Sequence, residues 1–438
     1  MKYLIKNADL VDMDDLTTGT TDILIEGNRI SKIGKDLPAS DCEVIDAQGM
    51  LALPGFIDCH THMAQSFIKG PLDDMPITDW LVKLFTIDAK MDEEIYYYAT
   101  LLGCLESLRF GTTCINEMGD DLHIPEQVKA IADAGIRATY GVSTTDVPEN
   151  DATPILSIEE ALAYHQQVLD TVSKEGNGLI KASVAPAGLP AVSAELARAC
   201  KKFADDHGLI YHTHLGEGKH ETENVARTYG LNGEAEALAE IGVLDKNVLL
   251  AHSIWLTDHE IDLIKEYGAY PVHCPNTNLK ISDGVPKIAQ MLEKGIPVTI
   301  GCDGEASSSN RDMIREARCG AYLQKGVTLD PTVMDASTVL KMMTINGAKA
   351  LGYDDLGLIK EGYQADLILV DMSNDLGLTD LQHRVSNLIY CADGHAVDTV
   401  FVNGVLKLRN KKLVDFDEKE IIDKCNKLIS KLNKAVGE

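Results

Sequence analysis

The stretch 53–65, "LPGFIDCHTHMAQ", ends an apolar run with two histidines one residue apart. In a β-strand, side chains two residues apart point to the same face, so His60 and His62 project side by side from one strand end. Imidazoles placed there need either hydrogen-bond partners or a metal ion. The rest of the chain decides between a structural pair of histidines and two ligands of one metal.

The chain that follows alternates short apolar strands with longer helical patterns. The further strand candidates read TTCINEM, RATYGVS, IKASVAP, LIYHTHLGE, NVLLAHS, GAYPVHCP and PVTIGCDG. Helical patterns lie between them, including 92–109, 124–134, 157–174 and 193–207. This alternation predicts parallel strands joined by crossover helices. With the first strand included, the pattern fits an α/β fold, the (β/α)8 TIM barrel, whose functional residues gather at the carboxyl ends of the strands.

The two ends of the chain differ from this middle part. Residues 1–54 form short β-rich pieces, and 397–414 is predicted as a hairpin because Asn403-Gly404 is a strong two-residue turn signal. A final amphipathic helix is expected over about 417–435. We therefore expect one half of a small composite β-sandwich domain over 1–54, the metal-dependent barrel over 55–355, and the second sandwich half with the terminal helix over 356–438.

Charge and cysteine content exclude several classes of partner. The 438 residues include 68 acidic and 40 basic side chains, a formal net charge of −28. This excess disfavours nucleic acids and anionic membranes, which attract basic surfaces. None of the ten cysteines forms a CxxC pair, which fits reduced thiols. The early acidic residues do not resemble a signal peptide, so we expect a cytoplasmic protein without nucleic-acid or membrane partners.

Residues that suit a metal site follow the predicted strands. They are His60 and His62, then His212, His214 and Glu217, then His252, His273 and Asp303. Each alone has an ordinary explanation, because a lone histidine is more often structural and an Asp before Gly usually marks a turn. Four strands that end in imidazole and another that ends in carboxylate are hard to obtain from packing alone. Such nitrogen and oxygen donors suit Zn²⁺ or Fe²⁺ better than Mg²⁺ or Ca²⁺.

These segments also resemble a known family. In this order, PGFIDCHTH, HTHLGE, LLAHS, HCPNTNLK and GCDGEAS are similar to the amidohydrolase superfamily, within it to the branch of 5′-methylthioadenosine/S-adenosylhomocysteine deaminases and their chlorohydrolase relatives. The resemblance spans the barrel and both halves of the small domain. It implies one divalent metal ion, with zinc as the first choice and iron or manganese as alternatives.

The resemblance also implies roles for individual residues. The implied metal ligands are His60, His62, His214 and Asp303. The implied catalytic residues are Glu217, as the acid and base, together with His252 and Asp303. Some relatives bridge two metals with a carbamylated lysine on the fourth strand, but Lys181 here sits early in that strand, away from the active end. A single metal is therefore the better match. His212 shares a strand face with His214, which makes it a candidate partner of the ligands.

Substrate contacts follow the family pattern less closely. The resemblance implies that Trp80 covers a flat heterocycle, although an anchor for its loop is an equal alternative. Gln65 either donates to the ring or meets solvent. Asp88 stands where adenosine-type members often carry a longer glutamate for the ribose hydroxyls. His273 either meets the substrate or makes a hydrogen bond within the mouth of the barrel.

Two motifs of the adenosine-type members are absent. The "PHxPY" motif after the fourth strand is replaced by APAGLPAVS at 185–193, and ATYGVSTTD at 138–146 has no arginine. We expect a mononuclear metal-dependent hydrolytic deaminase that converts an amino-substituted N-heterocycle to the oxo form and releases ammonia. Adenosine-type substrates, meaning 5′-methylthioadenosine, S-adenosylhomocysteine and adenosine, come first.

Three alternatives stay open. The same metal site would serve an s-triazine or guanidine amino- or chlorohydrolase, or a deaminase of a pterin or pyrimidine. An alternative of another class is a catalytically inactive metal-binding protein, against which the presence of Glu217, His252 and Asp303 argues. The partner is a small heterocyclic molecule in each enzymatic case. Related deaminases are often homo-oligomers, which leaves the oligomeric state open.

Overall fold

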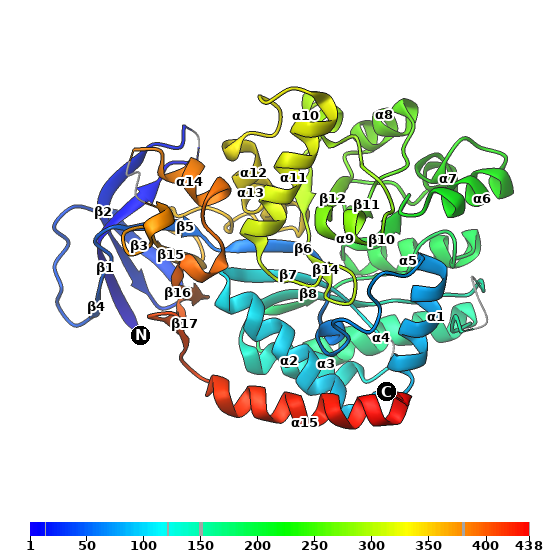
Figure 1. Ribbon diagram of the computed structural model, residues 1–438, viewed down its shortest axis with the longest axis horizontal. Helices are drawn as coiled ribbons and strands as arrows, with labels where there is room; N and C mark the ends of the chain where they lie inside the picture. Colours follow the sequence, from blue (N-terminus) through cyan, green and yellow to red (C-terminus); the bar gives the residue numbers. More distant parts are fainter. Residues whose placement is uncertain (14, 121, 149–151, 379–381, 438) are drawn as a thin grey trace.

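Figure 1 shows a β-sheet domain, built from both chain ends, beside a barrel covered by helices. This computed structural model describes residues 1–13, 15–120, 122–148, 152–378 and 382–437. Within those ranges no helix is long and apolar enough to cross a membrane. The two-part architecture is the one that the change in sequence rhythm at the chain ends predicts.

The barrel strands are parallel and follow one another around a ring. They are β6 (Phe56–His62), β7 (Thr112–Gly119), β8 (Arg137–Val142), β9 (Ile180–Ala182), β10 (Tyr211–Leu215), β11 (Val248–His252), β12 (Tyr270–His273), β13 (Thr299–Ile300) and β14 (Asp303–Gly304). They pair in the orders β14-β6-β7-β8-β9 and β10-β11-β12-β13. A parallel bridge between Val184 and Tyr211 joins the two sheets on one side. On the other side β13 and β14 come from one short segment, which confirms the eight strand positions of a TIM barrel.

Helices separate and cover these strands. They are α1 (Ile77–Asp88), α2 (Glu93–Arg109), α3 (Ile124–Ala134), α4 (Ile158–Glu175), α5 (Ala194–His207), α6 (Lys219–Tyr229), α7 (Glu234–Ile241), α8 (Asp258–Tyr267), α9 (Pro275–Lys280), α10 (Ile288–Glu293), α11 (Met313–Thr328), α12 (Ala336–Met342), α13 (Ile345–Ala350), α14 (Arg384–Tyr390) and α15 (Glu418–Val436). The predicted helices begin and end within about one residue of α2, α3, α4 and α5. Capping explains this accuracy, because Asp92 accepts from Ile95 N and Ser157 forms a capping box with Glu160.

The chain ends form one continuous nine-stranded sheet. Its strands are β1 (Lys2–Val11), β2 (Thr18–Glu26), β3 (Arg29–Gly34), β4 (Glu43–Asp46), β5 (Met50–Pro54), β15 (Leu367–Asp371), β16 (Val397–Val402), β17 (Val405–Arg409) and β18 (Lys412–Leu413). The predicted hairpin joins β16 to β17 through Asn403 and Gly404, both in the left-handed region with φ of 51° and 73°. The rings of Tyr3 and Phe401 lie 5.0 Å apart although other strands separate β1 from β16 in the sheet. The sandwich is therefore a single sheet that curls over its own core.

Alternation along the barrel strands separates ligands from core residues. Cys59 and Cys274, which neighbour His60 and His273, are buried in an apolar cluster that includes Ala348 and Leu351. Because alternate residues of a strand point to opposite faces, these cysteines face away from the barrel interior while the neighbouring histidines face into it. At the other end of the barrel, Lys181 Nζ lies 3.4 Å from the centroid of the Tyr353 ring, so this lysine is remote from the carboxyl ends of the strands.

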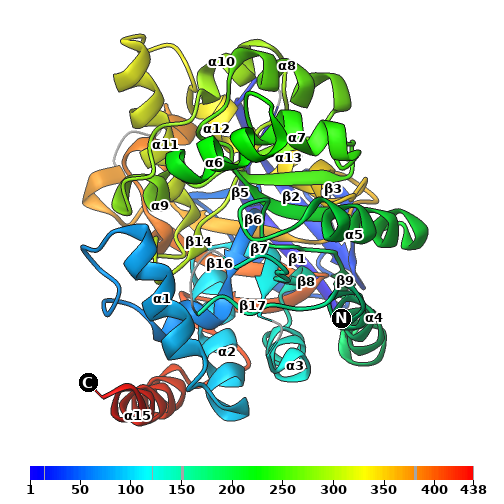
Figure 2. The same cartoon turned by 90° about the vertical axis from the view of Figure 1, so that its right-hand side faces the viewer.

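The terminal helix α15 packs on the barrel, although the sequence grouped it with the composite domain. Its buried residues Cys425, Leu428 and Leu432 share an apolar cluster with Trp80 of α1 and Ile95 of α2. Figures 1 and 2 show α15 lying along α2, with α1 beside it. The amphipathic pattern predicts that one face of α15 is buried, but it does not say against which part of the protein.

Candidate active site

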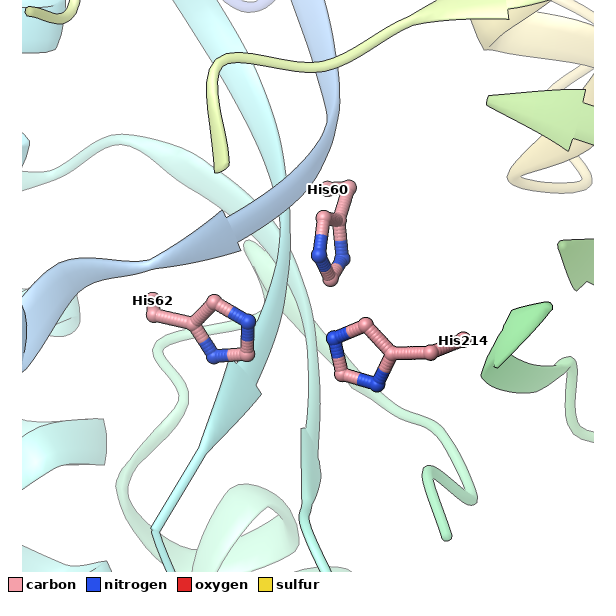
Figure 3. Close-up of side chains that lie close together, drawn as sticks. All are labelled: His60, His62 and His214. Carbon is pink, nitrogen blue, oxygen red and sulfur yellow. The ribbon is translucent and has the colours of Figure 1, made fainter. Parts of the chain in front are cut away.

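The predicted metal ligands meet at the carboxyl ends of their strands. The Nε2 atoms of His60 and His62, both on β6, each lie 3.5 Å from Asp303 Oδ1 on β14. The ring of His214, at the end of β10, lies 4.9 Å from the ring of His60. Figure 3 shows the three imidazoles turned toward a common point. Ligand atoms of these three histidines lie within 4.8 Å of one another, which suits a single metal ion.

The ligand histidines are oriented by their second nitrogen. His62 Nδ1 lies 2.8 Å from the carbonyl oxygen of Met118, and His214 Nδ1 lies 2.7 Å from that of Ala187. A carbonyl only accepts, so both rings carry a proton on Nδ1 and present the Nε2 lone pair to the site. Burial lowers the pKa of His62 to about 4 and holds that of His214 well below its usual value. Both rings are therefore neutral at pH 7, as metal ligands must be.

A chain of polar residues supports His60 from behind. His60 Nδ1 lies 3.0 Å from His212 Nε2, and His212 Nδ1 lies 3.0 Å from the side-chain amide nitrogen of Asn116. The hydroxyl of Thr139 donates to Asn116 Oδ1 at 2.5 Å. His212 is thus a partner of a ligand, as its place on the strand allowed. Asn116 was not predicted, because a lone asparagine in the strand "TTCINEM" carries no distinctive signal.

Orphaned nitrogen atoms test whether a cation fits this site. Among the described residues, the buried Nε2 atoms of His60 and His252 have no hydrogen-bond partner. A buried polar atom without a partner is costly and rare, and it calls for an explanation. Both atoms approach Asp303, at 3.5 Å for His60 and 4.0 Å for His252. A divalent cation coordinated by imidazole and carboxylate satisfies His60 Nε2, and an oxygen atom beside that cation gives His252 Nε2 a partner, so the residues present fit a metal.

The predicted catalytic residues lie beside the ligands. His252 Nε2 is 3.4 Å from Glu217 Oε1 and 4.0 Å from Asp303 Oδ2, so this imidazole stands between the two carboxylates. Its Nδ1 lies 2.9 Å from Asn278 Oδ1, which fixes the ring. His252 and Asp303 both have left-handed backbones, with φ of 68° and 66°. Such conformations cost about 1–3 kcal/mol each and are common at functional sites.

A buried arginine holds two of the ligand strands together. Arg311 donates from Nη1 to the carbonyl oxygen of Asp303 at 2.5 Å and from Nη2 to that of His62 at 3.0 Å. Its Nε lies 3.5 Å from Glu305, which also pairs with Lys69 Nζ at 2.5 Å. The side chains of Arg311 and Glu305 are fully buried. Sequence reasoning missed both, because an isolated arginine after a polar loop is usually a surface residue.

A cavity of about 300 Å³ opens above the ligands. Gln65, Trp80 and Asp88 line it, as do the predicted ligands His62, His214 and Asp303 and the predicted acid Glu217. His273 does not line it among the described residues. It is fully buried, and its Nε2 lies 3.3 Å from the position of a Cβ on Gly320 of α11, so it packs against that helix. The structure thus brings three of the four proposed substrate contacts to the cavity.

The missing family motifs leave small residues in the cavity wall. The segment after β9 contributes Ala187, Gly188, Pro190 and Ala191. The end of β8 contributes Ser143 and Thr145. These residues provide room and hydroxyl groups where the adenosine-type pattern has larger or charged side chains. In the sequence, only the absence of the family motifs marked these positions. An absent motif does not say which residues contact the substrate instead.

The chain belongs to the amidohydrolase family, whose sequence profile matches residues 51–407. It is 34% identical over 427 residues to the 5-methylthioadenosine/S-adenosylhomocysteine deaminase of Pyrococcus furiosus, covering 97% of this chain and 100% of the relative. A zinc-bound adenosine deaminase from Xanthomonas campestris has a TM-score of 0.91 at 28% identity, covering 99% and 98% of the two chains. Zinc-bound atrazine chlorohydrolase from Arthrobacter aurescens has a TM-score of 0.90 at 25% identity, covering 98% and 100%. The protein is therefore a hydrolase that acts on C–N bonds.

Proposed function

We propose that this protein is a mononuclear, zinc-dependent deaminase of an amino-substituted N-heterocycle, with 5′-substituted adenosines as the first substrate class. One observation carries the proposal: three imidazoles and Asp303 converge at the floor of a cavity that Glu217 also lines. The relatives named as deaminases support the adenosine class. The proposed ligands are His60, His62, His214 and Asp303.

The reaction needs a nucleophile and an activated ring. A divalent cation held by the proposed ligands would lower the pKa of a bound water molecule far below its value in bulk water and so supply a nucleophile at neutral pH. Asp303 accepts a proton from the attacking water. Glu217 donates a proton to the ring nitrogen next to the amino-bearing carbon, which makes that carbon electrophilic. His252, placed between these two carboxylates, holds the attacking oxygen through Nε2.

Proton transfer then completes the exchange of nitrogen for oxygen. The carbon–oxygen bond forms first and gives a tetrahedral carbon that bears both the hydroxyl and the amino group. The proton held by Asp303 passes to the amino group, the carbon–nitrogen bond breaks and ammonia leaves. The hydroxyl proton passes to Glu217, which replaces the proton that this side chain gave to the ring nitrogen, and the oxo form remains. Glu217 and Asp303 regain their starting states, so the cycle needs water alone as co-reactant.

Small aminated rings are the second candidate class. The cavity wall formed by 185–193 lacks the "PHxPY" residues and consists of small side chains. The overall likeness to atrazine chlorohydrolase supports an s-triazine hydrolase on the same ligands. The complete set of catalytic side chains argues against an inactive metal-binding protein, since such a protein has no need of Glu217.

Ammonia release from the zinc-loaded enzyme tests the proposal. The panel contains 5′-methylthioadenosine, adenosine, guanine, a pterin, cytosine and an aminated s-triazine. We expect the highest kcat/KM on an adenosine. Glu217→Gln abolishes turnover while zinc remains near one per chain, whereas Glu240→Gln, an exposed change on α7, leaves turnover intact. Full activity of Glu217→Gln, or release only from the small rings, would contradict the mechanism or the substrate class respectively.

Two further properties, the compartment and the oligomeric state, are also proposed. The cysteines are all free thiols, which supports a reducing compartment such as the cytoplasm. The apolar side chains Tyr322, Val327 and Leu329 are exposed around the end of α11, which supports a homo-oligomer. Light scattering of the purified protein at several concentrations measures the second property directly.

A further inference from the structure

The substrate cavity carries no cationic side chain among its described lining residues. Neither lysine nor arginine occurs in that lining. The residues outside the described ranges do not change this, because none of them is a lysine or an arginine in the sequence. A substrate group with negative charge, such as a carboxylate or a phosphate, therefore meets no ion-pair partner in the cavity wall.

The cavity wall instead contributes carboxylates beyond those used in catalysis. Asp88, buried at the end of α1, and Asp120, which follows β7, both line it. Glu234 lines it too, but its oxygens accept from Gly216 N at 3.0 Å and from the Thr222 hydroxyl at 2.8 Å, which gives this side chain a structural task. Like charges that share a site with little water repel each other strongly. An anionic substrate group thus meets further carboxyl side chains and no lysine or arginine among the described lining residues.

Two cations that neighbour the cavity in sequence, Lys280 and Lys219, make contacts elsewhere. Lys280 precedes the lining residue Ile281, but its Nζ lies 2.6 Å from Asp73 and 2.6 Å from the Ser309 hydroxyl. Lys219 follows the lining residue Gly218, but its Nζ lies over the ring of Trp255 at 5.2 Å. Neither side chain reaches the lining without giving up these contacts.

Two cations near the proposed metal ligands, Lys69 and Arg311, also have partners of their own. Lys69 pairs with Glu305 at 2.5 Å, and Arg311 donates to the carbonyl oxygens of His62 and Asp303. These two cations therefore stabilise the protein and the ligand strands. The formal net charge of −28 adds a long-range field that slows the approach of anions.

The part of the cavity away from the ligands is apolar. Helix α1, which also carries Trp80, contributes Ile77, Leu81, Leu84 and Phe85. Leu122 faces the same space, and Ala187 and Ala191 add small apolar surface. Such a wall favours an alkyl or thioether substituent, whose transfer from water is favourable at roughly 25 cal/mol per Å².

We propose that this enzyme accepts aminated heterocycles with an apolar substituent and rejects substrates whose substituent bears a carboxylate or phosphate. The inference rests on the proposed deaminase function and narrows its substrate class. Among adenosines, it separates 5′-methylthioadenosine, which is neutral, from S-adenosylhomocysteine and adenosine 5′-monophosphate, which carry anionic groups. The selection arises from the charge of the cavity wall and not from its size.

Steady-state ammonia release with matched substrates tests this proposal. The neutral 5′-butylthioadenosine has the same chain length as S-adenosylhomocysteine, and the 3-aminopropylthio analogue keeps the ammonium group without the carboxylate. We expect kcat/KM for S-adenosylhomocysteine to be about 100-fold below that of the butylthio compound, because an unpaired like charge costs several kcal/mol. The aminopropylthio analogue should react about as well as the butylthio compound. A ratio below about 10 would overturn the proposal.

A matched pair of variants tests the role of charge itself. Ser143 lies at the end of β8 in the cavity lining, with its backbone nitrogen bonded to Gly119 O at 2.8 Å. Ser143→Arg should raise the relative kcat/KM for S-adenosylhomocysteine about 10-fold or more, whereas Ser143→Met, similar in length and uncharged, should not. An equal change in both variants would contradict the proposal. Ammonia from no adenosine at all would instead refute the adenosine class, so the two failures are distinguishable.

Discussion

Replacement of Arg311 by methionine should destabilise the protein by about 5 kcal/mol. Methionine is similar in length and apolar, so the change removes the charge and the donors with little loss of volume. Breaking a buried ion pair costs about 3–5 kcal/mol, and the low end applies because Lys69 still pairs with Glu305 at 2.5 Å. The carbonyl oxygens of His62 and Asp303 each lose a donor, which adds about 1 kcal/mol apiece.

Urea unfolding of the zinc-loaded protein at pH 7, followed by circular dichroism, measures this loss. Arg315→Met is the matched control, because Arg315 is an exposed arginine in the first turn of α11, close to Arg311 in sequence, and its replacement should change stability by less than about 0.5 kcal/mol. The double variant Arg311→Met/Glu305→Gln should cost at least about 1 kcal/mol less than the sum of the single changes. A loss below about 1 kcal/mol for Arg311→Met would refute the structural role assigned to this arginine.

Three further predictions concern the pH dependence of stability, the hydrogen bond between Asn278 and His252, and the packing of α15 in the cluster that contains Trp80. Burial lowers the pKa of His165 to about 4, below the about 6.5 of an unfolded chain, so the folded state loses stability as pH falls from about 6.5 to about 4. Each pH unit in this range costs the wild type about 1.4 kcal/mol of unfolding free energy. Between pH 7 and pH 4, the unfolding free energy of His165→Leu, measured by urea titration, should therefore rise by roughly 3 kcal/mol relative to that of the wild type. A difference that stays constant with pH would contradict this prediction. Asn278→Ala frees the His252 ring and should lower kcat about 10- to 100-fold with zinc content unchanged, and loss of zinc would instead point to a ligand role. Leu428→Ala opens a gap in the apolar cluster that also contains Trp80 of α1, and it should raise KM with little change in kcat. A fall in kcat at constant KM would show that α15 does not act on substrate binding through α1.

Periodicity and strand-end chemistry were sufficient to predict much of the fold and the site. The helix predicted at 92–109 has Asp92 as its N-cap, so residues close together in the sequence determine where it begins. The histidines of "HTH" at 60–62 sit at a strand end, and parallel strands of a barrel bring such ends to one mouth. These features depend on residues close in sequence or on a general property of the architecture. For that reason they were visible without the structure.

Other features depend on contacts between distant segments. Arg311 contacts His62 although the two lie 249 positions apart in the chain, and Asn116 contacts His212, yet neither Arg311 nor Asn116 lies in a sequence pattern that marks it. The docking of α15 on α2 likewise depends on which apolar surfaces remain after the barrel has formed. His273 shows the limit of the strand-end rule, because its side chain packs against Gly320 instead of entering the cavity.

The central claim is that one metal ion, held by His60, His62, His214 and Asp303, is required for deamination. Its most direct test measures zinc content and ammonia release on the same samples of wild-type protein before chelation, after chelation and after zinc is restored, with His214→Ala alongside. We predict about one zinc per chain, loss of metal and activity together, recovery of both with zinc, and neither in His214→Ala. Full ammonia release from protein that holds less than about 0.1 zinc or other metal per chain would contradict the account.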